Sequence, residues 1–332
     1  MKLSLEQIRS VTAGAVRIEE KDGRICFFRF TEEQQQLYFY HSEAFYKKCF
    51  CTAGIKLKFV TDSKTISLKV IIKSGSSRRF FAHDIYVNGT LRYTLGGVLE
   101  NQDGTARESM DVCGSYELGE GEKTVCVYFP WSVISELCYL ELDDGASVKP
   151  VAYSRKMISF GDSITHGYDA SHPSLSYSSL LADALDADAV NKGIGGEVFR
   201  PELAYARDDL EPEIITVAYG TNDWSNTEKE IFDKNSEAFY AQLSQNYPNA
   251  KIFAFSPIWR KDHEKITNVG KFTYVTEKFE DIVNSLPNVT FIDCYDTVPH
   301  DPAMFSPDVL HPNDKGFSHY AKGVIDAIKQ YI

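Results

Sequence analysis

The chain has 332 residues, 43% of them hydrophobic and 25% charged, and its formal net charge is −12. These proportions are typical of a folded protein, and the length suits two domains better than one core. The acidic balance argues against a nucleic-acid partner and against electrostatic docking on anionic membranes, because both attract a basic surface.

The N-terminal segment MKLSLEQIRSVTAG has no long apolar stretch and is interrupted by Glu6 and Arg9. It therefore does not predict a secretory leader, and no run of about 18 apolar residues predicts a membrane span. We expect a cytoplasmic protein without a membrane partner. The seven cysteines are an odd number, and several lie in apolar runs, so we expect buried free thiols rather than a disulfide framework.

Residues 1–150 are predicted to form an accessory domain, a β-sandwich of jelly-roll type. Short runs rich in Val, Ile, Tyr and Phe are separated by turn residues, as in such sandwiches. The runs are RICFFRF, LYFYH, IKLKFVT, TISLKVII, DIYVNGTLRYTL, EKTVCVYFP and CYLELDD. The Asn-Gly pair in residues 87–90 is a strong hairpin signal, and IKLKFV alternates apolar and polar residues as a half-buried strand does.

Residues 151–332 show a different pattern of apolar residues and are predicted to form a second, catalytic domain. The boundary between the two domains is expected within residues 143–153. Apolar runs now alternate with segments whose apolar residues recur at helical spacing. The runs are KMISF, DAVNKG, IITVAYG, KIFAFSP and VTFIDCY. Alternation of strands and helices predicts a parallel sheet covered on both faces, here a three-layer α/β/α sandwich with five strands.

Polar segments follow the strands of this second half. They are GDS at residues 161–163, NKGIGGE at 191–197, GTNDW at 220–224 and, after a loop, DVLHPND at 308–314. In a parallel sheet these segments meet at the carboxyl edge, where sites of such folds lie. Together they contain a serine, a histidine, carboxylates and backbone donors, which are the parts of an acyl-transfer site.

In this order, FGDSITHG, NKGIGG, YGTND and DVLHPN resemble the conserved blocks of the SGNH, or GDSL-type, hydrolase superfamily. The resemblance covers about residues 154–332 and implies a flavodoxin-like SGNH fold. The strand-rich half is similar in organisation to the N-terminal jelly roll of two-domain carbohydrate esterases.

A serine hydroxyl becomes a good nucleophile only when a base removes its proton. Ser163 is the candidate nucleophile, although serine is also favoured as a helix N-cap and the two roles are compatible. His311 is the candidate base, and Asp308 is expected to orient its ring as the third member of a triad. The alternative for Asp308 is a turn residue after Pro307.

The resemblance also implies an oxyanion hole made by the backbone N–H groups of Ser163 and Gly196 and the side-chain amide of Asn222. Gly193 and Gly195 compete with Gly196 for this role. The alternative for Asn222 is an Asx-turn.

Other side chains near these segments have competing interpretations. His166 is a rival base, and Asp162 is expected to make structural hydrogen bonds around the turn. Asp223 and Trp224 are candidate substrate contacts. Trp259 is expected either to stack on a sugar or to belong to the core. The remaining histidines show no metal-ligand spacing, so neither a metal nor a cofactor is predicted.

The resulting hypothesis is a serine esterase that removes small acyl groups, acetyl above all, from an alcohol such as an acetylated saccharide. The expected partner is a small-molecule or oligosaccharide ester, and an oligomer is compatible with the sequence. Two alternatives remain: a lipase or thioesterase acting on longer chains, because this fold accepts many substrates, and a non-catalytic carbohydrate-binding protein.

Overall fold

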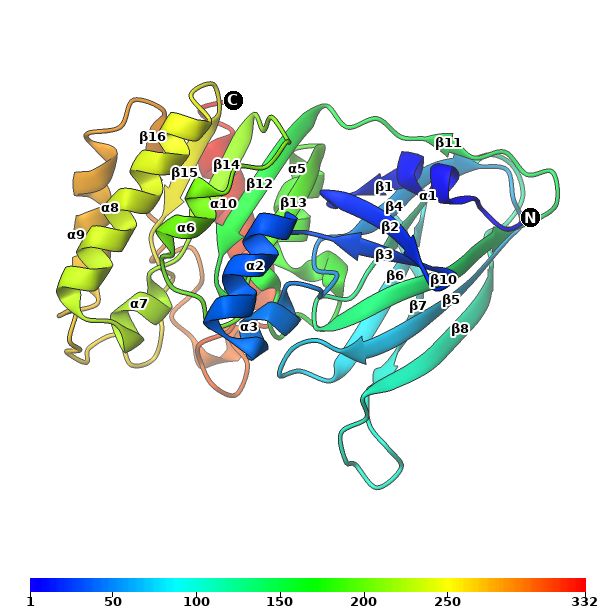
Figure 1. The fold of residues 1–332 in the computed structure, drawn as a ribbon, viewed down its shortest axis with the longest axis horizontal. Coiled ribbons are helices and arrows are strands. Elements are labelled where there is room, and N and C mark those ends of the chain that lie inside the picture. The colour runs from blue at the N-terminus through cyan, green and yellow to red at the C-terminus, as the bar shows by residue number, and fades with distance from the viewer.

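The computed structural model describes all 332 residues and contains two antiparallel sheets and one parallel sheet (Figure 1). The antiparallel sheets pack face to face around a core of Ile, Val, Leu and Phe side chains, which confirms the predicted β-sandwich. One sheet has the order β1 (Thr12–Ala13), β4 (Lys56–Thr61), β9 (Lys123–Tyr128), β6 (Phe80–Val87) and β7 (Thr90–Val98), with β11 (Lys149–Pro150) beside β4. The other has the order β2 (Arg17–Lys21), β3 (Arg24–Phe28), β10 (Val133–Leu142), β5 (Thr65–Ser74) and β8 (Ser109–Glu117).

The predicted Asn-Gly hairpin joins β6 to β7. Asn88 has φ 49° and Gly89 has φ 76°. A two-residue turn of this kind needs positive φ at both positions, which glycine and asparagine adopt most easily. The hairpin prediction is therefore confirmed.

The segment LYFYH, predicted as a strand, is instead the end of helix α2 (Glu32–His41). Thr31 starts this helix with a capping box: its hydroxyl accepts the Gln34 N–H, and the Gln34 side chain accepts the Thr31 N–H, both at 3.2 Å. Tyr38 is buried against Phe30. Capping and packing thus override the strand preference of the aromatic residues. Two more helices of this half are α1 (Leu5–Val11) and α3 (Glu43–Lys48).

The C-terminal half contains the predicted five-stranded parallel sheet. Its strands are β13 (Ala187–Gly193), β12 (Arg155–Gly161), β14 (Ile214–Ala218), β15 (Lys251–Phe255) and β16 (Val289–Ile292), in that spatial order. Its main helices are α4 (Ser163–His166), α5 (Tyr177–Ala184), α6 (Pro201–Tyr205), α7 (Thr221–Asn226), α8 (Lys229–Asn246), α9 (Thr273–Val283) and α10 (Asp314–Ile328). Helices α6, α8 and α9 cover one face and α5 and α10 the other, which confirms the three-layer fold.

Helices α2 and α3 lie between the sandwich and the parallel sheet (Figure 1). Phe30, Tyr38 and Cys49 belong to the same buried cluster as Ile158 and Phe160 of β12. The N-terminal half therefore supplies part of the core that covers the parallel sheet.

All seven cysteines are free thiols, and the predicted burial holds for Cys49, Cys51, Cys126 and Cys294 but not for Cys113, which is exposed. None of the helices combines the length and the apolar character that crossing a membrane requires.

Candidate active site

Ser163 stands at the carboxyl edge of the parallel sheet, where β12 ends and α4 begins. Asp162 is the N-cap, and its carboxylate accepts the Ile164 N–H at 2.9 Å. Ser163 is the first helical residue, so its own N–H has no acceptor within the helix. Gly161 permits this turn, because a Cβ there would lie 2.0 Å from Thr165 Oγ1. The turn holds the Ser163 hydroxyl at the edge where the other predicted segments arrive.

The loop of residues 308–311 brings a histidine and a carboxylate to this serine. His311 Nε2 is 2.8 Å from Ser163 Oγ, and His311 Nδ1 is 2.6 Å from Asp308 Oδ2. The other Asp308 oxygen accepts the N–H groups of Leu310 and His311, at 3.0 and 3.1 Å. Partial burial alone would raise the pKa of Asp308, but the His311 ring and these N–H groups outweigh it and hold that pKa well below its ordinary value. The three side chains thus form one continuous hydrogen-bonded chain.

The hydrogen bonds of the second segment separate its three glycines. The Gly193 N–H is donated to Asn191 Oδ1 at 2.8 Å, and the Gly195 N–H to His166 Nδ1 at 3.3 Å. The Gly196 N–H is donated to no protein acceptor, and Gly196 has φ 89°. Among the three glycines, Gly196 is the one whose N–H is available to a ligand.

Asn222 is near the start of α7, directly after β14. Its Nδ2 donates one N–H to the carbonyl of Glu197 at 3.0 Å. This bond ties the side chain to the glycine segment and leaves the second N–H of the amide free. The Ser163, Gly196 and Asn222 donors are therefore all unsatisfied by the protein.

His166, the rival base, is buried and held by two structural hydrogen bonds. Its Nε2 donates to the Trp131 carbonyl at 2.9 Å, and its Nδ1 accepts the Gly195 N–H. Burial lowers the pKa of His166 well below its ordinary value. This ring supports the glycine segment from the sandwich side and has no hydrogen bond to Ser163.

Three candidate substrate contacts make structural contacts instead. The Asp223 carboxylate is buried and accepts the N–H groups of Phe199 and Gly220. Trp224 is 1% exposed, and its Nε1 donates to the Gly270 carbonyl. Trp259 is 8% exposed and stacks on His300 with ring centroids 5.2 Å apart. Substrate contact is thus corrected to core packing for Asp223 and Trp224, because neither side chain is accessible, and Trp259 fits the core interpretation.

Residues of the N-terminal half that no sequence motif indicates support the glycine segment. Lys48 Nζ donates to the Gly195 carbonyl at 2.6 Å. Arg29, fully buried, donates to the carbonyls of Cys51, Asn191, Gly193 and Lys48 and has no carboxylate partner. No local spacing in the sequence signals these contacts, since each partner is far away along the chain.

A second carboxylate and an arginine also lie beside His311. Asp169 Oδ2 is 3.7 Å from His311 Nδ1, and Arg78 of the sandwich holds both Asp169 oxygens. The oxygen and nitrogen atoms of Asp169, Asp308 and His311 lie within 4.8 Å of one another, a spacing suited to a metal ion. The Arg78 guanidinium already satisfies Asp169, however, so the donor set fits a hydrogen-bonded charge network better than a cation site.

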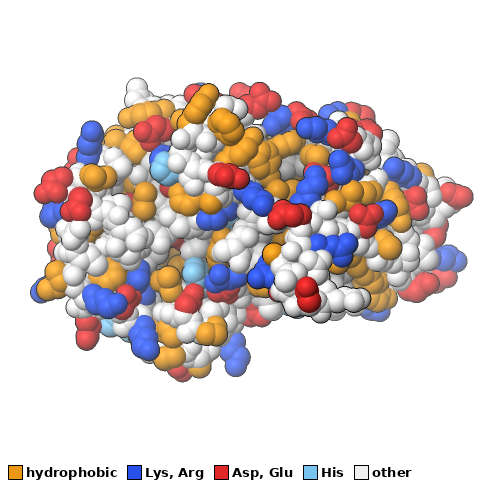
Figure 2. Space-filling model, turned by 60° about the horizontal axis from the view of Figure 1, so that its bottom comes forward, with side chains coloured by type: hydrophobic (Ala, Val, Ile, Leu, Met, Phe, Trp, Pro, Cys, Tyr) orange, Lys and Arg blue, Asp and Glu red, His pale blue; other side chains and the backbone are white.

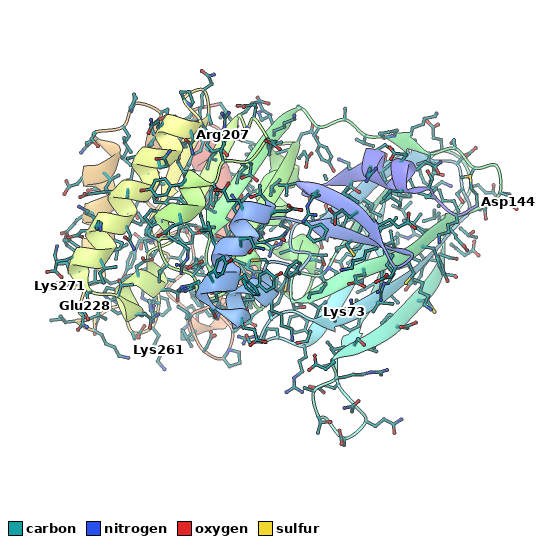
Figure 3. All side chains as sticks on the ribbon, in the orientation of Figure 1. Lys73, Asp144, Arg207, Glu228, Lys261 and Lys271 are labelled. Carbon is teal, nitrogen blue, oxygen red and sulfur yellow. The ribbon has the colours of Figure 1, made fainter.

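The site opens onto a surface of mixed charge. A groove of about 560 Å³ adjoins Asp308 and is lined by Arg260, Lys261, Asp262, Glu264, Lys265, Val309 and Leu310. Lys261 projects from the parallel-sheet half at this edge, and Lys73 lies on the sandwich side (Figure 3). Basic and acidic side chains are interspersed over this face (Figure 2). No extended patch of one sign marks it for a polyanion.

Comparisons with known proteins identify a family model and solved structures that this chain resembles. Residues 159–318 match the model of the GDSL-like Lipase/Acylhydrolase family. A search of curated protein sequences found no match.

Among solved structures, a salicylyl-acyltransferase from a tetracycline biosynthetic pathway is 20% identical with a TM-score of 0.82, over 97% of this chain and 95% of that one. A protein described as a GDSL-like lipase from Bacteroides ovatus is 18% identical with a TM-score of 0.77, over 99% and 97%. An acetyl xylan esterase from the rumen bacterium Butyrivibrio proteoclasticus is 17% identical with a TM-score of 0.67, over 99% and 98%. At these identities the likeness establishes a shared two-part fold.

Proposed function

We propose that the chain, which carries a GDSL-like lipase/acylhydrolase domain, hydrolyses small acyl esters, acetyl esters of saccharides above all. The proposed machinery is a triad of Ser163, His311 and Asp308. The observation that carries the proposal is the His311 ring, which is hydrogen-bonded to Ser163 Oγ on one side and to Asp308 on the other.

In the first step, Ser163 Oγ attacks the ester carbonyl carbon while His311 Nε2 takes the hydroxyl proton. Asp308 keeps the His311 proton on Nδ1 and stabilises the imidazolium that forms. The carbonyl oxygen becomes an oxyanion, which the N–H groups of Ser163 and Gly196 and the Asn222 amide stabilise. These donors are the ones that the protein leaves unsatisfied.

In the second step, the imidazolium gives its proton to the leaving alcohol oxygen, and the C–O bond breaks to leave an acyl group on Ser163. Water then attacks this acyl-enzyme, and His311 takes the proton of the water. Collapse of the second tetrahedral intermediate releases the carboxylic acid and returns the proton to Ser163. Every atom of the two products comes from the ester and the water.

Support for a saccharide ester comes from the architecture. Structures of family two carbohydrate esterases, one in complex with cellohexaose, share the fold with TM-scores of 0.62 to 0.67. In this chain the open groove beside Asp308 offers charged and polar side chains for hydroxyl groups rather than an apolar tunnel. Such a surface suits a sugar better than a long acyl chain.

A second candidate is transfer of the acyl group to an alcohol instead of water. It is favoured by the salicylyl-acyltransferase, which has a TM-score of 0.82 and covers nearly the whole chain. The acyl-enzyme is common to both reactions, and only the second acceptor differs.

The test is hydrolysis of 4-nitrophenyl esters from acetate to octanoate by the wild-type protein, with peracetylated xylose and cellobiose as saccharide substrates. We expect the highest kcat/KM for acetate and loss of turnover in Ser163→Ala. Ser318→Ala is the matched control and should retain activity, because Ser318 is an exposed serine on α10 that makes no side-chain hydrogen bond. Equal rates for the wild type and Ser163→Ala would overturn the triad, and a maximum beyond hexanoate would favour a lipase. Formation of the ester of an added alcohol from the 4-nitrophenyl ester would favour transfer.

A further inference from the structure

Arg78 belongs to the β5–β6 loop of the sandwich, yet its guanidinium reaches Asp169, which follows α4 in the other half. Its Nε is 2.6 Å from Asp169 Oδ1, and its Nη2 is 3.0 Å from Asp169 Oδ2. This two-bond fork is the most specific geometry for an arginine and a carboxylate. The Asp169 side chain is 13% exposed and that of Arg78 is 33% exposed, so the pair is largely shielded from water.

The clamped Asp169 carboxylate faces the same ring nitrogen as Asp308. Asp169 Oδ2 is 3.7 Å from His311 Nδ1, against 2.6 Å for Asp308 Oδ2. Arg78 Nη2 also lies 4.0 Å from Asp308 Oδ2. His311 thus faces two carboxylates, with one guanidinium close to both of them.

Tyr168 connects the same groups by packing. Its ring stacks on His311 with centroids 5.6 Å apart and an interplanar angle of 29°. The Arg78 guanidinium lies 5.4 Å from the centroid of the same ring. A shift of Arg78 would therefore disturb both the charge around His311 and the ring that supports it.

We propose that Arg78 and Asp169 are a positioning pair for His311, through which the β-sandwich sets the charge balance at the catalytic base. The role of His311 as base rests on the proposed function. Asp169 adds a negative charge beside the imidazolium that forms, and the Arg78 guanidinium offsets this charge. The sandwich is then part of the catalytic apparatus rather than an appended module.

The charged groups that face His311 come from several elements. Asp308 is on its own loop, Asp169 follows α4, and Arg78 comes from the sandwich. Asp162, buried behind Ser163 at the end of β12, also interacts with the His311 charge. Removal of one member of the Arg78–Asp169 pair changes the net charge around His311 by one elementary charge. Removal of both leaves that net charge nearly unchanged.

The test measures kcat/KM against pH for Arg78→Gln, Asp169→Asn and the double variant at low ionic strength. The acid limb reports loss of the neutral base. We expect Asp169→Asn to move the midpoint of the acid limb about half to one pH unit lower, because an unpaired cation is left near the imidazolium. Arg78→Gln should move it about as far upward, and the double variant should return it close to the wild type.

Arg79→Gln is the matched control, since Arg79 is next in the chain and pairs with Glu100 instead. Its acid limb should stay in place. Arg78→Lys retains the positive charge but not the two-bond fork, so the acid limb should stay at its wild-type pH while kcat falls several-fold. This variant replaces Arg78→Gln in the test if Arg78→Gln does not fold. Thermal unfolding reports the fold of each variant.

A second measurement separates this inference from the proposed function. Titration of the His311 ring by ¹⁵N NMR needs no turnover and should show the same opposite displacements in the two single variants. If the two single variants are active and their acid limbs do not move, or move in the same direction, the positioning role is overturned and the proposed esterase function stands. A wild type without ester turnover would overturn the proposed function, and the NMR titration would still decide whether the pair acts on His311.

Discussion

Replacement of Asn222 by alanine tests the proposed oxyanion hole at its one side-chain donor. Asn222 donates one N–H to the Glu197 carbonyl at 3.0 Å and has a second N–H free. Loss of a comparable donor in other enzymes lowers kcat by about 10²–10³-fold, or about 2.7–4 kcal/mol of transition-state stabilisation. We expect this loss in kcat with KM changed little, because the donor acts on charge that develops after binding.

The same substitution removes the bond to Glu197, which lies in a partly buried position. The expected cost is about 0.5–1.5 kcal/mol of the free energy of unfolding. Steady-state kinetics with a 4-nitrophenyl ester and chemical denaturation separate these two effects. Asn226→Ala is the matched control, because Asn226 is on the same helix α7, is exposed and makes no side-chain hydrogen bond.

Asn222→Asp sharpens the test, since it retains the shape and places a negative charge at the oxyanion. It should be slower than Asn222→Ala. A loss of kcat below about 10-fold in Asn222→Ala, or an equal loss in Asn226→Ala, would refute the assignment of Asn222 to the oxyanion hole.

Three further predictions concern the framework of the site. Gly193→Ala should lower the melting temperature and the activity together, because the new Cβ would lie 2.3 Å from the His166 backbone nitrogen; an unchanged melting temperature would contradict this clash. Arg29→Met should cost about 1–3 kcal/mol in urea unfolding, since buried carbonyls lose their donor, and a cost below 1 kcal/mol would contradict it. Burial raises the pKa of Asp162 to about 6 and of Asp223 to about 7. The folded state therefore retains these two protons to higher pH than the unfolded state does, so the two carboxyls contribute a fall in the free energy of unfolding as pH rises from about 4 to 7, against the rise that buried His166 contributes. Denaturation across this range should show a more positive slope of the free energy of unfolding against pH in Asp162→Asn than in the wild type, and an identical slope would count against the effect.

The meeting of the site segments was predictable because most of them follow strand ends. Ser163 and Asn222 directly follow apolar runs, and His311 comes with Asp308 three residues before it. The fold of a parallel sheet brings such segments to one edge whatever the sequence between them. The sequence therefore predicted the parallel sheet and the three residues that the structure connects by hydrogen bonds, Ser163, His311 and Asp308.

The contribution of the sandwich to the site was not predictable in the same way. Arg78 and Asp169 are 91 positions apart, and neither belongs to a periodic pattern or a motif. Helix α2 was predicted as a strand because LYFYH has strand-favouring aromatic residues. The Thr31–Gln34 capping box was the local signal for a helix, and tertiary packing decided the outcome.

The Arg29 contacts have a consequence for the order in which the chain folds. Arg29 is 162 positions from Asn191 and 164 from Gly193, yet it supplies hydrogen bonds to both carbonyls. Contacts between such distant positions form late, since the intervening chain must first be ordered. We therefore expect the glycine segment to take its final shape only after both halves have docked, so that an incompletely folded chain has no ester-cleaving activity.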